Sequence, residues 1–184
     1  MDIADSNRLC FRMITEKDVQ LLFQLDQDPE VMRYINGGTA TTMQAIEEVY
    51  LPRLNAYRNP DTGWGLWHVA LKSTQQFLGW ILIRPMNFFN NQPNEQPELD
   101  NLEIGWRFFQ EFWGNGHCTE AAQAIMQGIQ DQNQVRAFSA IALTENRASI
   151  QVMKKLGMQF VKTYLHEDPL MDSPEECVYY QLAY

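Results

Sequence analysis

The stretch EFWGNGHCTEAA at residues 111–122 combines a glycine-rich turn with the start of a helix. Gly114 and Gly116 flank Asn115, and the segment before them, LEIGWRFF at 102–109, is typical of a strand. The first turn of a helix has backbone N–H groups without intrahelical acceptors, and glycine lets an anion approach the backbone closely. The stretch therefore suits a phosphate group. An ordinary strand–turn–helix junction has the same features, so both interpretations stay open at this point.

The cysteines and histidines form no recognisable motif. The three cysteines are widely separated and odd in number: Cys10, Cys118 and Cys177. We therefore expect reduced thiols, as in a cytoplasmic protein, and neither a disulfide framework nor a zinc site. The three histidines also lack a common spacing: His68, His117 and His166. The sequence thus predicts no catalytic triad and no metal site.

Composition and charge restrict the class of protein. The 184 residues, of which 45% are hydrophobic and 20% charged, suit one globular domain over 1–184. No run of about 18 apolar residues predicts a membrane span, and the first residues lack the pattern of a signal peptide. The formal net charge of −9 argues against nucleic-acid binding. It favours cationic partners or serves simple solubility.

Apolar periodicity predicts the elements that carry these residues. Seven segments have strand character: 8–14, 64–71, 77–84, 102–109, 135–143, 158–165 and 177–184. Helix starts are expected at the capping box of Thr15 and Asp18, at Asp28-Pro29, and at Thr41 or Thr42. A helix with small and apolar residues on one face follows Gly116, and another opens at 145–149 and ends at Gly157. We expect an α/β fold with a mixed, mostly antiparallel twisted sheet flanked by helices.

The segment 85–100 is predicted to be a polar loop, long for a compact domain and therefore of functional interest. Phe88 and Phe89 within it are either a lid or a small satellite of the core. We favour the core.

Four segments, in this order and spacing, carry a family resemblance: RLCFRMITEKD, DPEVMRYI, LEIGWRFFQEFWGNGHCTEA and ENRASIQVMKKLGMQF. The chain resembles the GNAT superfamily of acyl-CoA N-acyltransferases. Within it, the chain is similar to the branch typified by ribosomal-protein N-terminal acetyltransferases of the RimJ/RimL type. The resemblance implies acetyl-CoA as the cosubstrate, no metal, and transfer of the acetyl group to an amine by direct attack.

The resemblance also assigns the cofactor contacts. The family's loop has the form Gln/Arg-x-x-Gly-x-Gly/Ala, and here Glu111 departs from its first position. Because the main chain would bind the phosphates, this departure would weaken their anchoring only slightly. Backbone N–H groups would bind the pyrophosphate along Trp113, Gly114, Asn115, Gly116, His117, Cys118 and Thr119. The strand before the loop would splay from its neighbour, and the backbone of Ile104, Gly105 and Trp106 would bind the pantetheine arm. Asn146 would contact the pantetheine region, although its position in the sequence is by itself typical of a helix cap.

Three side chains are candidates for catalysis by the same resemblance. Glu103 would act as general base, directly or through a water, although a salt-bridged strand carboxylate is equally compatible with the sequence. Ser149 would protonate the leaving thiolate, with Tyr164 as the alternative acid. Alone, Ser149 reads as a neutral helix residue and Tyr164 as a strand aromatic. Direct attack needs no enzyme nucleophile, so Cys118 is not required, although a helix N-terminus would lower the pKa of its thiol.

The acceptor amine would lie opposite the cofactor, framed by residues 34–38, Trp80, Arg84 and the 85–100 loop. A protein N-terminus, a polyamine and an aminoglycoside all fit the acidic balance, and the protein N-terminal α-amine is preferred. Two other readings keep the fold: acetylation of a small metabolite or antibiotic, and a non-catalytic acyl-CoA-binding regulatory module. A monomer, or a weak homodimer through the terminal strand, is expected, without nucleic-acid or membrane partners.

Overall fold

A computed structural model describes residues 1–89, 96–167 and 173–184. In these ranges seven strands form one sheet in the order β1-β2-β3-β4-β5-β7-β6. The strands are β1 (Leu9–Met13), β2 (Gly65–Leu71), β3 (Phe77–Met86), β4 (Glu98–Phe108), β5 (Ala137–Leu143), β6 (Gln159–His166) and β7 (Glu175–Ala183). Every neighbouring pair is antiparallel except β4 and β5. The predicted mixed, mostly antiparallel α/β fold is confirmed.

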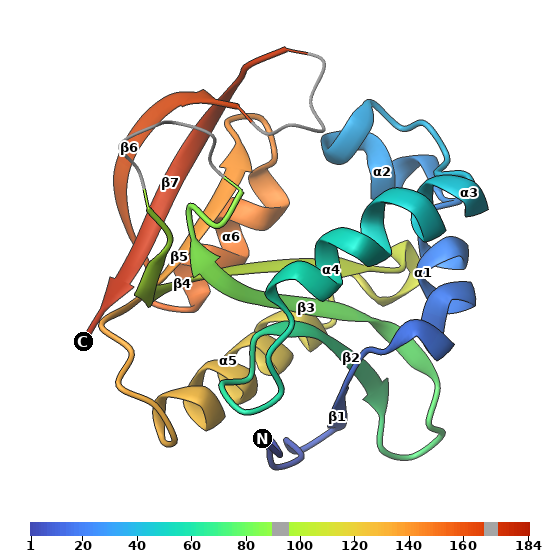
Figure 1. Ribbon diagram of the computed structural model, residues 1–184, viewed down its shortest axis with the longest axis horizontal. Helices are drawn as coiled ribbons and strands as arrows, with labels where there is room; N and C mark the ends of the chain where they lie inside the picture. Colours follow the sequence, from blue (N-terminus) through green and yellow to red (C-terminus); the bar gives the residue numbers. More distant parts are fainter. Residues whose placement is uncertain (90–95, 168–172) are drawn as a thin grey trace.

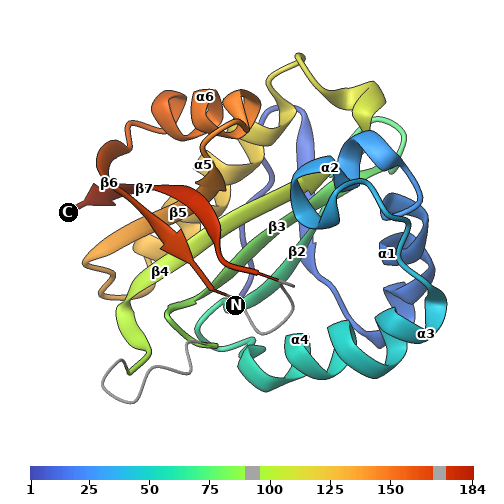
Figure 2. The same ribbon diagram turned by 90° about the horizontal axis from the view of Figure 1, so that it is seen from above.

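Helices cover both faces of the sheet (Figures 1 and 2). One side carries η1 (Glu16–Asp18), α1 (Val19–Leu25), α2 (Pro29–Asn36), α3 (Met43–Ala45), the π-helical η2 (Ile46–Tyr50) and α4 (Leu51–Tyr57). The other side carries α5 (His117–Gln130) and α6 (Arg147–Lys155), and the short η3 (Gln110–Phe112) leads from β4 toward α5. No helix in the described ranges is long and apolar enough to cross a membrane.

The parallel pair β4–β5 is short. Its register joins Asn101 to Ala137, Leu102 to Phe138 and Glu103 to Ser139, and no later pair follows in the described residues. Beyond this point β4 stays paired with β3, and β5 stays paired with β7. The two strands therefore diverge, as Figure 1 shows, and the second half of β4 keeps one edge without a strand partner.

The main core lies between the sheet and α5. The predicted apolar face of α5 is buried: Ala121, Ala122, Ile125, Met126 and Ile129. A second cluster lies on the opposite face, where Ile46 and Leu54 pack with Tyr57. Phe88 and Phe89 pack against this cluster, with their ring centroids 5.8 and 6.0 Å from that of Tyr57. Their assignment to the core is confirmed.

The predicted loop at 85–100 was too long. β3 runs on to Met86 and β4 already begins at Glu98, because the two strands resume pairing at Met86 and Glu98 after a register shift. Residues 90–95 of that predicted loop lie outside the described ranges. The helix starts were predicted correctly: Thr15 and Asp18 form a capping box, and Asp28 and Thr42 cap α2 and α3.

His68 gives the fold a testable pH dependence. Burial, reinforced by the charge of Arg12, lowers the pKa of its imidazole to about 4. In the unfolded chain the imidazole binds a proton near pH 6.5, so between about 6.5 and 4 only the unfolded state is protonated there. Stability is therefore lost as the pH falls through this window. The His68→Phe variant should lose about 1–3 kcal/mol less than the wild type on this acidification.

The measurement is urea denaturation followed by circular dichroism at pH 7 and at pH 4.5. Because both chains keep the same carboxyl groups, the difference between them isolates the imidazole. An identical pH dependence in the two chains would contradict the assignment.

Candidate functional site

The glycine turn has the geometry of an anion site. Gly114 and Gly116 have φ of 75° and 77°, in the left-handed region that favours glycine, and Gly116 caps α5. The N–H of Glu120 bonds the carbonyl oxygen of Gly116 at 3.0 Å. Among the described residues, the N–H groups from 114 to 119 have no protein acceptor. These consecutive donors therefore surround the positive end of the α5 dipole.

A pocket of about 330 Å³ lies beside this turn, and we call it the cofactor pocket. Its walls come from the turn, the first turn of α5, one side of α6 as far as Lys155, the end of β4 and one side of α2. The wall contains most of the predicted cofactor residues: Trp106, Trp113, Gly114, Gly116, His117, Cys118, Thr119 and Asn146. Ile104 and Gly105 lie on the stretch of β4 that has separated from β5. The structure therefore brings the predicted cofactor residues to one region.

The start of α6 is tied to β4 across the opening between the strands. The Asn146 side chain accepts a hydrogen bond from the N–H of Ser149 at 3.1 Å, so Asn146 is the helix cap that its sequence position suggests. The Ser149 hydroxyl accepts a hydrogen bond from the Trp106 indole N–H at 3.2 Å. Because a hydroxyl that accepts a bond keeps its own hydrogen, Ser149 remains able to donate a proton into the pocket.

Alternation along β4 presents different side chains to the two faces of the sheet. Ile104 and Phe108 point into the core under α5, whereas Glu103 and Arg107 line a second pocket of about 350 Å³ on the face of α1–α4. This second pocket also contains Trp80 and Arg84 and residues 34–36 of α2. It coincides with the region predicted for the acceptor, and we call it the acceptor pocket.

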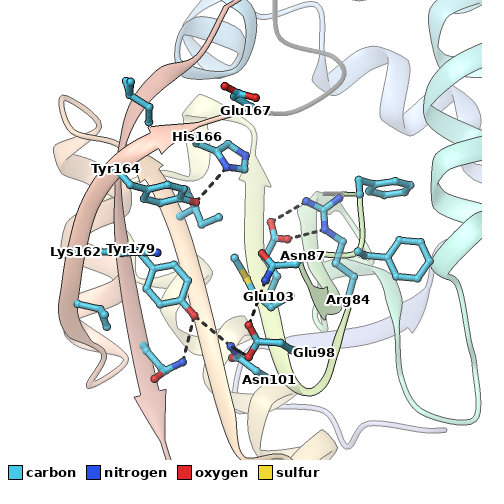
Figure 3. Close-up of a pocket in the computed structure, with 17 residues that line it drawn as sticks. Arg84, Asn87, Glu98, Asn101, Glu103, Lys162, Tyr164, His166, Glu167 and Tyr179 are labelled. Carbon is cyan, nitrogen blue, oxygen red and sulfur yellow. Dashed lines mark hydrogen bonds and ion pairs between the residues drawn. The ribbon is translucent and has the colours of Figure 1, made fainter. Parts of the chain in front are cut away.

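Glu103 is held in an ion pair. Arg84 on the neighbouring strand β3 donates to both of its carboxylate oxygens, at 2.7 and 3.0 Å (Figure 3). The side chains are 14% and 16% exposed, so the pair is largely removed from water. From the sequence, Glu103 could be a salt-bridged carboxylate or a catalytic base. The structure shows the salt bridge, and the paired carboxylate faces the acceptor pocket.

Tyr164 lies in a third pocket, of about 650 Å³ and polar in its lining, shown in Figure 3. Its hydroxyl lies 3.1 Å from Nδ1 of His166. Glu103 and Arg84 line this polar pocket as well as the acceptor pocket, so the two pockets adjoin. Tyr164 is not part of the described wall of the cofactor pocket, whereas Ser149 is. The structure thus separates the two candidate acids.

One expectation about Cys118 was wrong. The helix N-terminus was expected to lower the pKa of the Cys118 thiol, but burial raises that pKa far above the usual range. Burial therefore outweighs the helix dipole at this position. Burial also raises the pKa of the Cys177 thiol, to about 11, with a smaller contribution from the charge of Glu175. All three cysteines are free.

Two contacts were not predicted from the sequence. Arg107, which lines both the cofactor and the acceptor pockets, forms an ion pair with Asp26 at the end of α1 and lies over the Trp80 ring. Arg8 at the start of β1 pairs with Glu120 in α5 at 2.6 Å. The alternation of Glu103, Gly105 and Arg107 along the strand places Arg107 on the face of Glu103, but it does not identify Asp26 as the partner. Arg8 and Glu120 are 112 positions apart, and no sequence pattern connects them.

No group of three or more metal-ligating side chains occurs in the ranges 1–89, 96–167 and 173–184.

Comparisons with known proteins fit this geometry. The model of the acetyltransferase (GNAT) domain family matches residues 8–159. The Bacillus subtilis protein YkkB, itself uncharacterized, is 32% identical over 161 residues, which are 86% of each chain. Among solved structures, a GNAT-family acetyltransferase from Bacillus anthracis has a TM-score of 0.77 at 22% identity, over 100% of this chain and 98% of that one.

The aminoglycoside acetyltransferase AAC(6')-Ib, solved with ribostamycin and coenzyme A, has a TM-score of 0.76 at 18% identity. The likeness covers 96% of this chain and 94% of that one. At such identities the two solved structures support the fold alone, whereas the family model, which matches most of the chain, identifies the family. The chain therefore belongs to the acetyltransferase (GNAT) family and is an N-acetyltransferase that uses acetyl-CoA.

Proposed function

We propose that the chain acetylates a primary amine, a protein N-terminal α-amine in the first place, by direct attack in a ternary complex. One observation carries this proposal: the cofactor pocket and the acceptor pocket meet at β4 and share Tyr34, Ile35 and Arg107. An amine in one pocket therefore reaches a thioester in the other without a covalent enzyme intermediate. Such an arrangement supplies proximity and orientation.

The cofactor residues fit the cosubstrate. Acetyl-CoA supplies an acetyl group activated as a thioester. The free N–H groups from 114 to 119 would hold its pyrophosphate, and a Cβ atom added at Gly114 would meet nothing within 4 Å, so the backbone is open to a phosphate. The unpaired edge of β4 at Ile104, Gly105 and Trp106 offers further backbone groups to the pantetheine arm.

Glu103 is the proposed general base. A carboxylate has about four lone-pair sites, so the two hydrogen bonds from Arg84 leave others for a water or the amine. An α-amine, with a pKa of about 8, asks less of a base than a lysine amine does, with a pKa of about 10.4. This chemistry suits an α-amine as the acceptor.

Ser149 is the proposed acid in preference to Tyr164. It lines the cofactor pocket and keeps a hydrogen to donate, because its oxygen accepts the bond from Trp106. Tyr164 lies in the polar pocket with His166. A proton from Ser149 would therefore reach the leaving thiolate by a shorter path.

The local charge of the acceptor pocket favours an acceptor with a single amine. The two acidic residues in its described wall, Asp26 and Glu103, are each paired with an arginine. The net charge of −9 is therefore not concentrated there. This observation supports a peptide α-amine, as in the RimJ/RimL branch, over a polyamine.

The polar pocket supports a second candidate acceptor. Its volume of about 650 Å³ and its side chains Glu98, Asn101 and Tyr179 suit a hydroxyl-rich amine of the aminoglycoside kind. Release of free thiol with peptides and with aminoglycosides, compared at equal concentration, distinguishes the two. Turnover of peptides alone supports the first proposal, and turnover of aminoglycosides alone overturns it.

The Gly114→Asp variant tests the phosphate site. A carboxylate next to the free N–H groups repels a phosphate and competes for the same donors, so coenzyme A should bind at least about tenfold more weakly by calorimetry. Gly157→Asp is the matched control, because Gly157 is also left-handed, with φ of 82°, but lies outside the described walls of the pockets. Equal affinities of the two variants would rule out the loop as the phosphate site.

The Glu103→Gln variant tests the base. An amide cannot accept the proton of the attacking amine, so the variant should lose about 10²-fold in kcat, while coenzyme A affinity stays unchanged. With a peptide as the acceptor, Glu98→Gln is the control, because Glu98 lines the polar pocket and not the acceptor pocket. A kcat of Glu103→Gln close to that of the wild type would exclude Glu103 as the base.

Direct attack also predicts the behaviour of Cys118. Because burial keeps this thiol protonated at neutral pH, incubation with acetyl-CoA and no amine should leave Cys118 unmodified in mass spectra. Because burial raises the pKa of the Cys118 and Cys177 thiols, a maleimide reagent should label Cys10 before either of them. An acetyl thioester on Cys118 would contradict direct transfer.

A further inference from the structure

Arg8 reaches from the start of β1 to the glycine turn. Its Nε donates to Oε2 of Glu120 at 2.6 Å, and its Nη1 donates to the carbonyl oxygen of Asn115 at 3.1 Å. The guanidinium is thus fixed both to the first turn of α5 and to the middle of the turn between the two glycines. This contact joins two segments that are far apart in the sequence.

Glu120 holds Arg8 in place. Its Oε1 also accepts hydrogen bonds from the Arg8 N–H at 2.8 Å and from the Ser6 hydroxyl at 2.7 Å. Partial burial opposes ionisation of Glu120, but these bonds and the charge of Arg8 prevail and lower the pKa of its carboxyl. The carboxylate therefore stays ionised at neutral pH and keeps the guanidinium beside the turn.

The remaining nitrogen of Arg8 points to the place that the glycine leaves open. Nη2 lies 3.6 Å from the position that a Cβ atom of Gly116 would occupy. In the described part of the chain Nη2 has no acceptor. A charged donor therefore lies beside Gly116, next to the free N–H groups from 114 to 119 and outside the described wall of the cofactor pocket.

The turn itself brings no cation to this space. Residues 111–122 contain neither lysine nor arginine, and Glu111 stands where the family pattern has Gln or Arg. Burial, together with the charge of Arg8, lowers the pKa of His117, so this imidazole stays neutral at pH 7. In the described residues Arg8 is the cation that hydrogen-bonds the turn, whereas Lys155 and Arg107 line the pocket beside it.

We propose that Arg8 binds the pyrophosphate of acetyl-CoA, in the position of the basic residue that the turn lacks. Nη2 donates to a phosphate oxygen, while Nη1 holds the Asn115 carbonyl oxygen so that the neighbouring N–H groups face the ligand. Charge-assisted bonds of this kind are stronger than those between neutral groups. The inference rests on the proposed cofactor site and assigns to it a side chain from outside the motif.

Calorimetry with coenzyme A and with dephospho-coenzyme A tests this role, because both contain the pyrophosphate and only the first has the 3'-phosphate. Arg8→Gln should weaken the binding of both ligands equally, by about tenfold. Arg8→Lys, which keeps the charge, should recover part of the loss. In turnover, Arg8→Gln should raise the KM for acetyl-CoA and leave kcat close to that of the wild type.

Lys72→Gln is the matched control. Lys72 also anchors the N-terminal segment, through Ser6 O at 3.2 Å and Asp5 at 3.7 Å, but does not touch the turn. The affinity of the Lys72→Gln variant for coenzyme A should stay within about twofold of that of the wild type. Thermal unfolding shows whether each variant is folded. If Arg8→Gln is not folded, Arg8→Lys replaces it, and its loss of affinity for coenzyme A is compared with its loss of affinity for dephospho-coenzyme A.

Three results would overturn the inference: an unchanged affinity of Arg8→Gln, a loss confined to coenzyme A, or an equal loss in Lys72→Gln. An unchanged affinity of Arg8→Gln would mean that Arg8 does not contact the ligand. A loss confined to coenzyme A would mean that Arg8 contacts the 3'-phosphate and not the pyrophosphate. An equal loss in Lys72→Gln would mean that the affinity depends on how the N-terminal segment packs. A wild type that binds neither ligand would instead refute the proposed cofactor site, so the two failures are distinguishable.

Discussion

The separation of β4 from β5 is the constraint on which the rest of the site depends. The parallel pair ends at Glu103 and Ser139, and each strand then continues with a single partner, β3 or β7. Backbone groups on the open edge of β4 must find other partners, because unpaired polar groups are costly when buried. The opening is bridged by the hydrogen bond from Trp106 to Ser149, so α6 lies against the gap. The sheet topology thus leaves one edge of β4 open, and we propose that the extended pantetheine arm binds along this edge.

We propose that the same strand contacts both substrates, because its side chains alternate between the two faces of the sheet. Trp106 lines the cofactor pocket, whereas Glu103 and Arg107 face the acceptor pocket. Two ion pairs, Arg84–Glu103 and Arg107–Asp26, fix the acceptor face and are mostly buried. Breaking such a pair leaves a buried charge without a partner and costs about 3–5 kcal/mol. These pairs therefore hold the acceptor face in position. In each pair the arginine balances the negative charge of the carboxylate.

Much of the fold could be predicted from the sequence, because its signals are local. The cap at Thr15, the Asp28-Pro29 start and the apolar face of α5 all depend on residues within a turn or two of each other. The glycine turn was predicted for the same reason. The early start of β4 was missed, because it depends on its pairing with Met86. The contacts of Arg8 and Arg107, and the burial that governs Cys118, were beyond prediction since tertiary packing decides them.

The central claim is that coenzyme A occupies the opening between β4 and β5, with its phosphates at the start of α5. Backbone amide chemical shifts, followed by nuclear magnetic resonance during titration with coenzyme A, test this most directly. The account predicts that the largest changes fall on the amides of 104–106 and 114–119, with small changes on β1, β2 and β7. Large shifts elsewhere, with those two segments unaffected, would contradict it.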